Sequence, residues 1–486
     1  MSERPQHVVD RAPTAGRSPE MDTDATADPS AEEVETDVEA PGKSGIVFWA
    51  LLVSFCLIFV FTSVDLYKST PLTVSLNKMF LEGATKVGIS VLDGIVLILS
   101  LTLLSRYGAD FRSARLILKV IFVSAVICWL LNLLNPNDRS VDKVMGLPLL
   151  AEFAAYPYLL FMFTVFFMKK KTFAVFARRI FLVSSWCLVL RSVILLAQWA
   201  RGEGNRAFFG INSVLTEGDS LFIFALFQSV FFAVFLLTHR RAALVAWLLT
   251  VAIQVFSYRR SALFLGLIVN AGTLTLHILS APNRRSRLRG AMAGAIVALL
   301  GYAVVTFVVS PEVVDQYLSR YLGMFAGAST DPSVSDSGHF NETSTTMLYA
   351  FQRMEFWGFG YGDPSRVAIP GATQRQYIHN VYAAVWWHHG MYMFLFFLML
   401  LLTGVFSLVV LLMHHARHEW PVVLVTGTVL LYFVALSISW LFDPIAMAEA
   451  LRMRLMWVFM LAFVFKTTDD NYGLLFPIAG DDDATA

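Results

Sequence analysis

The sequence predicts an all-α fold, a polytopic membrane helix bundle of about 12 transmembrane helices with one long extramembrane loop. Of the 486 residues, 57% are hydrophobic and 14% are aromatic, and the mean hydropathy is +0.62. A soluble globule does not bury that much apolar surface in one core. Apolar runs long enough to cross ~30 Å of hydrocarbon recur along the chain. Lys and Arg gather in alternate connections between these runs.

The chain begins with a polar segment, residues 1–45, that carries an acidic run from Glu20 to Glu39 without any Lys or Arg. A segment of low hydrophobicity and one sign of charge does not offset the entropy of ordering it. We therefore expect a disordered acidic tail. No cleavable signal peptide is expected, because the first apolar run begins only at Ile46.

The candidate membrane helices fall into two groups, one within residues 46–309 and one within 379–466. Most have roughly the 20 apolar residues that a spanning helix needs, and the seventh is short. They are residues 46–64, 87–104, 116–134, 149–168, 180–199, 219–238, 242–256, 261–279, 291–309, 379–413, 421–441 and 445–465.

The connections between these helices predict the orientation of the chain, because short loops rich in Lys and Arg stay on the cytoplasmic side. Both termini, including the tail 467–486, are then cytoplasmic. Among the outward connections only residues 310–378 are long, and we expect a short helix near Met347 to Phe356 in this loop. The basic connections contain Arg106, Arg112 and Arg115; Lys169, Lys170, Lys171, Arg178 and Arg179; Arg240 and Arg241; Arg284, Arg285, Arg287 and Arg289; and Arg417.

Several ionisable residues lie within or beside the predicted spans, notably Asp93, Arg191, Asp219 and the pair Arg259 and Arg260. Such residues cost ~2.5–3.5 kcal/mol each on insertion scales and often mark functional sites. The topology places them in the outer half of the membrane. Arginine side chains bind phosphate oxygens through a planar fork and indicate an anionic substrate. The alternative is structural, with Arg191 paired to Asp93 or Asp219.

Three stretches resemble a known family. They are RAFFGINSVLTEGD (206–219), SYRRSALFLGLIV (257–269) and the segment from Arg353 to Gly390, which combines RMEFWGFGYG with HNVYAAVWWHHG. Together they resemble the superfamily of O-antigen ligases and Wzy-type O-antigen and exopolysaccharide polymerases. The first resembles the family's outer-loop arginine followed by a glycine and an asparagine, and the second its serine-arginine entry into a helix. The third resembles its glycine-rich turn before a histidine-asparagine pair.

The resemblance implies a GT-C-like bundle in the bacterial inner membrane and a metal-independent, inverting glycosyltransferase that acts at the periplasmic face. It implies that His379 is the catalytic base and that Arg260, supported by Arg259 and Arg206, stabilises the pyrophosphate leaving group. No metal and no other cofactor is expected. The further residues expected to contact the pyrophosphate or the glycan are Arg191, Arg353, His339, Tyr377, Asn380 and Tyr361.

The expected reaction polymerises polyprenyl-pyrophosphate-linked oligosaccharide repeat units into a surface polysaccharide or exopolysaccharide. An O-antigen ligase, which transfers the glycan to a lipid or protein acceptor, is the first alternative. A transporter or flippase of a lipid-linked anionic glycan is an alternative of another class. The expected partners are the lipid-linked donor, a glycan or lipid-linked acceptor, the lipid bilayer and a chain-length regulator, and no nucleic acid.

Two groups of side chains have simpler expected roles. The three cysteines, Cys56, Cys128 and Cys187, lie in apolar runs and are expected to be buried and free. Tyr382 and the neighbouring Trp386 and Trp387 are expected to form an aromatic belt at the headgroup level rather than a platform for a sugar.

Overall fold

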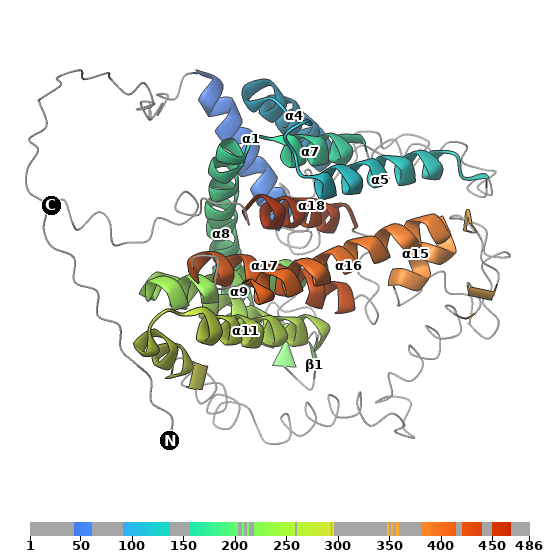
Figure 1. Ribbon diagram of the computed structural model, residues 1–486. Helices are drawn as coiled ribbons and strands as arrows, with labels where there is room; N and C mark the ends of the chain where they lie inside the picture. Colours follow the sequence, from blue (N-terminus) through green and yellow to red (C-terminus); the bar gives the residue numbers. More distant parts are fainter. Residues whose placement is uncertain are drawn as a thin grey trace, which may run out of the picture. The chain divides into compact units, whose positions relative to one another are not determined.

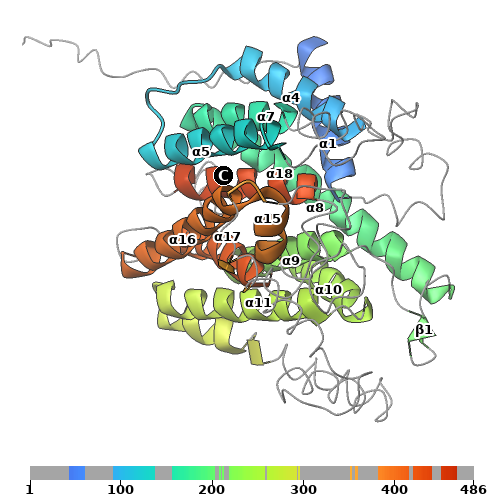
Figure 2. The same cartoon turned by 90° about the vertical axis from the view of Figure 1, so that its right-hand side faces the viewer.

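The computed structural model describes a bundle of helices (Figures 1 and 2). The chain divides into two units, Met1–Gly45 and Ile46–Ala486, and nearly all of the described residues belong to the second. The described residues are 43–60, 91–136, 156–202, 207–208, 211–212, 218–257, 260–292, 294–295, 348, 351–352, 356–358, 381–414, 420–439 and 450–467.

The part of the chain that the structure describes is almost entirely helical, as the sequence predicts. A single antiparallel hairpin, β1 (Ala207–Phe208) and β2 (Ile211–Asn212), pairs Ala207 with Asn212 within the first of the three family-like stretches. The helices are α1 (Lys43–Val60), α4 (Val91–Tyr107), α5 (Leu116–Leu133), α7 (Tyr156–Phe167), α8 (Lys170–Ala200), α9 (Gly218–Thr238), α10 (Arg241–Phe256), α11 (Arg260–Ser280), α15 (Val381–His389), α16 (Met391–Met413), α17 (Trp420–Ser439) and α18 (Ala450–Thr467).

Five of the described helices are long and apolar enough to cross a membrane. They are α5, α8, α16, α17 and the part of α11 from Ala262 to Ser280. Shorter apolar helices lie within α1, α7, α9, α10 and α18. The chain therefore has the character of a polytopic membrane protein, while the count of about 12 spans stays a prediction.

The helices pack in two groups. In the first, α9 lies against α10, α11 and α17, and α11 lies against α17 (Figure 1). In the second, α7 lies against α4 and α5. The groups are connected by α18, which packs against α7, α8 and α17, and by α16, which packs against α5 and α17.

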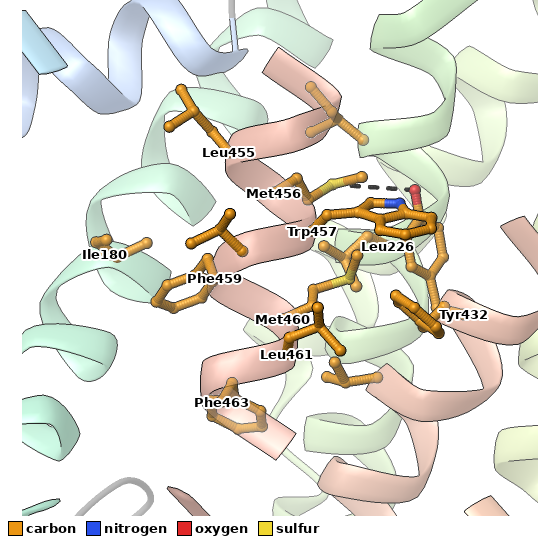
Figure 3. Packing of buried hydrophobic residues seen from close by; sticks show 14 of the residues in the cluster. Ile180, Leu226, Tyr432, Leu455, Met456, Trp457, Phe459, Met460, Leu461 and Phe463 are labelled. Carbon is orange, nitrogen blue, oxygen red and sulfur yellow. Dashed lines mark hydrogen bonds between the residues drawn. The ribbon is translucent and has the colours of Figure 1, made fainter. Parts of the chain in front are cut away.

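From Leu455 to Phe465, side chains on all faces of α18 are buried, as Figure 3 shows for its middle turns. Phe459 packs edge-on against Phe181 of α8 at 5.4 Å between ring centroids, whereas Trp457 contacts Phe433 of α17 at 4.6 Å. Tyr432 of α17 donates a hydrogen bond to the Phe222 carbonyl of α9. A helix that is hydrophobic all round belongs in a core, so the last predicted span occupies the interior of the bundle.

The predicted fifth span begins too late. Residues 170–179, expected within a basic loop, form the first turns of α8, which is 31 residues long. At a rise of ~1.5 Å per residue this helix measures about 46 Å, more than the ~30 Å of a hydrocarbon core. The Lys and Arg side chains are good helix formers. They continue the helix beyond its apolar part, where Lys170, Lys171 and Arg178 are exposed.

The connection between α4 and α5 is held by Asp110. Its Oδ1 accepts hydrogen bonds from the backbone N–H groups of Arg112 and Ser113 at 3.0 and 3.2 Å. Its own N–H donates to the Phe167 carbonyl at the end of α7. Hydrogen bonding from Ser113, joined by the N–H of Arg112 and the charge of Lys169, lowers the pKa of the exposed Asp110 carboxyl below its usual value.

The free and buried state expected for the cysteines is confirmed for Cys56, Cys128 and Cys187. The two terminal tails lie outside the described residues, apart from the start of α1. Of the helix expected near Met347 to Phe356, the structure describes Leu348, Phe351 and Gln352, which are helical.

Candidate functional site

A buried group of polar side chains lies where the end of α5 meets the junction of α15 and α16. It includes one end of the segment from Arg353 to Gly390, the third of the three family-like stretches. The group lies away from the basic connections, because α5 begins beside Arg115 and α16 ends at His414. We call Asn132, His389 and Tyr392 the corner cluster.

The chain turns sharply at Gly390, so the single helix predicted over 379–413 is wrong. Gly390 has φ 95°, a conformation that side chains disfavour. A Cβ at this position would lie 1.9 Å from the Phe356 carbonyl oxygen. The rings of Trp386 and Phe394 stack at 4.7 Å across the turn. The short helix α15 therefore folds back beside the first turns of α16 (Figure 1).

Asn132 is the centre of the corner cluster. Its Oδ1 accepts a hydrogen bond from the Tyr392 hydroxyl at 2.5 Å and lies 3.2 Å from His389 Nδ1. An amide oxygen only accepts, so His389 carries a proton on Nδ1 in this arrangement. The three residues are 6–8% exposed. Buried polar groups without partners cost several kcal/mol in hydrocarbon, roughly 2–7, so these contacts allow polar side chains here.

A second contact joins α5 to the glycine-rich turn. Asn135 donates from Nδ2 to the Trp357 carbonyl at 2.8 Å. The Phe356 and Trp357 rings lie 5.4 and 6.1 Å from the ring of Tyr392. The start of the glycine-rich turn, Phe356 to Gly358, thus packs against both the end of α5 and the corner at Gly390.

The other half of α15 is anchored to α17. The Tyr382 hydroxyl donates to the Ser437 carbonyl at 2.7 Å, and Val381, the first residue of α15, is fully buried. Trp386, Trp387 and Tyr382 are at most 6% exposed. The expected aromatic belt is therefore wrong, because these rings pack inside the bundle when α15 folds back, and they do not face outward.

Arg191 is the predicted site residue whose side chain the structure describes, and it lies in the core of the bundle at 1% exposure. Its Nη1 donates to the carbonyl of Val60, the last residue of α1, and its guanidinium lies 5.3 Å from the Phe224 ring. The last carbonyls of a helix lack intrahelical donors and carry its negative dipole end. Both contacts stabilise a buried cation.

Asp93, expected as a partner of Arg191, accepts a hydrogen bond from the Tyr158 hydroxyl at 2.5 Å. It is buried and lies in the first turn of α4, where the positive end of the helix dipole favours a carboxylate. A hydrogen bond and the end of a helix therefore stabilise each of these two buried charges.

The other predicted site residues are not placed. Arg260 is the first residue of α11, and the structure describes its backbone alone. The roles assigned to these residues stay predictions. The predictions that lie outside the described residues concern Arg206, Arg259, His339, Arg353, Tyr361, Tyr377, His379 and Asn380.

Sequence reasoning missed Asn132, Asn135 and Tyr392. Two asparagines at the end of an otherwise apolar span are a weak signal, because amides also occur where helices leave the membrane. Their partners are distant in the chain, with 260 positions between Asn132 and Tyr392. No periodicity reports such a contact.

The comparison of this sequence with protein-family models and with curated proteins found no match in either set. The family expectation therefore remains one carried by the three short stretches and by the order of the helices.

Proposed function

We propose that this protein is a metal-independent, inverting glycosyltransferase that polymerises polyprenyl-pyrophosphate-linked oligosaccharides. The observation that carries the proposal is the setting of the His379-Asn380 pair, which directly precedes α15. That helix is buried at its first residue, Val381, and is held by polar contacts at both of its ends. A base placed beside a rigid, buried helix suits a reaction that depends on positioning.

The proposed chemistry follows from the residue types. Breaking the bond between the sugar and the pyrophosphate develops negative charge on phosphate oxygens, which arginines stabilise without a metal. Arg260, Arg259 and Arg206 are assigned to this role. The imidazole of His379 titrates near neutrality and takes the proton of the acceptor hydroxyl. Tyr377 and Asn380 orient it, and Arg353, His339 and Tyr361 complete the proposed substrate contacts.

The proposal includes a location. The basic connections put the termini in the cytoplasm and put the corner at Gly390 on the outer side of a bacterial inner membrane. It also includes about 12 spans in a GT-C-like bundle, of which the five long apolar helices are the supported part.

The position of the break at Gly390 favours an enzyme over a transporter. Transporters of the broken-helix type interrupt their helices near the middle of the membrane. Here α16 has 23 residues after the break, and at ~1.5 Å per residue they measure about 35 Å. This length covers the ~30 Å hydrocarbon core without α15. The break therefore lies at one edge of the membrane.

The test is glycan transfer by the purified protein in detergent or nanodiscs. Donor alone is expected to give a ladder of products that lengthens with time and is unchanged by a chelator of divalent metals. His379→Ala and Arg260→Ala are expected to lose at least about 100-fold in rate. His414→Ala is the matched control, because its ring contacts the Val410 carbonyl of its own helix, at the end of α16 opposite the corner cluster.

The acceptor is decided by the same assay. Product that forms only when a lipid or protein acceptor is added identifies a ligase. Movement of the lipid-linked glycan across a proteoliposome membrane without any new glycosidic bond identifies a flippase, and this outcome contradicts the proposal.

A further inference from the structure

The residue at the centre of the corner cluster belongs to none of the three family-like stretches. Asn132 lies in the last turn of α5, well before the part of the chain that carries the resemblance. Its contact with His389 is nonetheless a polar link from α5 to α15, the helix that follows His379 in the chain, and its contact with Tyr392 links α5 to α16. The function of Asn132 therefore depends on the two helices, α15 and α16, that these contacts hold against α5.

We propose that Asn132 is a positioning residue for the glycan-transfer reaction, acting by fixing α15 against α5. This inference rests on the proposed function. In the described part of the chain, Asn132 contacts no residue to which a step of the reaction is assigned. It accepts hydrogen bonds from the two residues that flank the turn, His389 at the end of α15 and Tyr392 in the first turn of α16.

Contacts around Gly390 have to fix the angle between α15 and α16. Gly390 has the conformational freedom to adopt several angles between α15 and α16. Its surroundings select one, because the Phe356 carbonyl occupies the space beside Gly390 and Asn132 joins both sides of the turn. Asn135 adds a link from the same end of α5 to Trp357. Loss of Asn132 therefore removes an acceptor that both sides of the turn share.

The direction of α15 matters because the helix is short. It has nine residues and is about 13 Å long at ~1.5 Å per residue. A tilt of about 10° at its His389 end moves its Val381 end by roughly 2 Å over that length. A displacement of about 1 Å can cost 100-fold in rate when a reaction depends on near-attack geometry.

Steady-state kinetics of glycan transfer by the full-length Asn132→Leu variant, compared with wild type, test the proposal. The expected result is a kcat lower by about 10- to 100-fold with a donor KM within about threefold. Asn132→Asp keeps an acceptor oxygen and is expected to retain at least about a third of the wild-type kcat. Thr428→Val is the matched control, because it removes a buried hydroxyl of α17 that contacts Thr273 of α11 and not the corner cluster.

A second measurement does not depend on activity. Ala383 lies in α15 and is fully buried, so Ala383→Cys should react slowly with a small maleimide. Adding Asn132→Leu is expected to raise that reaction rate by about tenfold or more, as expected for a locally opened helix. The Thr428→Val background should leave it unchanged. The chain without Ala383→Cys measures labelling of the three native cysteines, which are buried.

The two measurements separate the possible failures. No transfer by the wild-type chain, combined with faster labelling in Asn132→Leu, overturns the proposed function and retains the fixing of α15. Transfer by the wild type with an unchanged kcat in Asn132→Leu overturns the positioning role. Unchanged labelling in Asn132→Leu shows that Asn132 does not fix α15, and overturns that contact as the basis of the positioning role. A loss of kcat in Thr428→Val as large as in Asn132→Leu also overturns it.

Discussion

Replacing Gly390 by alanine tests the most specific geometric claim, that the chain must turn at this residue. Two effects add at this position. Alanine at φ 95° with an extended ψ is in a region that costs about 1–3 kcal/mol. A Cβ 1.9 Å from the Phe356 carbonyl oxygen also forces a shift of backbone, and such overpacking costs about 1–3 kcal/mol. The expected destabilisation is about 3–5 kcal/mol.

Two other glycines separate the contributions. Gly108 has φ 65° with nothing within 4 Å of an added Cβ, so Gly108→Ala should cost only the strain, about 1–2 kcal/mol. Gly94 lies in α4 in open space, and Gly94→Ala should change stability by less than about 1 kcal/mol, in the stabilising direction.

The assay is unfolding of each purified variant in mixed micelles containing increasing amounts of a denaturing detergent. The expected order of stability is Gly94→Ala, wild type, Gly108→Ala and then Gly390→Ala. A Gly390→Ala protein as stable as Gly108→Ala would refute the close approach of Phe356. Equal stability of Gly390→Ala and wild type would refute the broken helix itself.

Two further predictions concern charged residues. Arg191→Gln removes the charged group that donates to the Val60 carbonyl and should lower the free energy of unfolding by about 1.5–3 kcal/mol in the same assay. Unchanged stability together with a raised KM for the lipid-linked glycan would assign Arg191 to substrate binding instead. Asp110 has a pKa lowered in the folded state, so its stabilisation is fully present above the unfolded value of about 3.9 and is lost as the pH falls through the folded pKa. Asp110→Ala should therefore be less stable than wild type from neutral pH to about pH 5, and the difference should shrink below about pH 4; a difference that persists at low pH would show that the carboxylate charge is not its source.

The sequence predicts helix positions well where polar residues bound an apolar run. The expected span 219–238 agrees with α9, and 261–279 agrees with α11 to within a residue at each end. It fails where a bounding signal is ambiguous. Residues 170–179 have the charge of a loop and the helix propensity of a helix, and the helix prevails because it continues from the apolar part of α8.

The break at Gly390 has a cause that lies elsewhere in the chain. Glycine alone is tolerated in membrane helices, so HHGMYMF reads as one continuous helix. The deciding contact is the Phe356 carbonyl beside Gly390. In the same way, an asparagine at position 132 becomes informative only when Tyr392 is placed beside it. For the predicted site, the sequence indicates arginines and other residue types that suit an anionic donor. Arg191 shows that a buried arginine can instead stabilise the packing of helices.

Glycan transfer with a defined donor is the most direct test of the central claim. Purified wild-type protein and its His379→Ala variant are incubated with polyprenyl-pyrophosphate-linked oligosaccharide, and both released polyprenyl pyrophosphate and extended glycan are quantified. We predict that wild type releases one polyprenyl pyrophosphate for each new glycosidic bond formed and that His379→Ala loses about 100-fold or more in rate. Full activity in His379→Ala, or donor that crosses the membrane without forming either product, would contradict it.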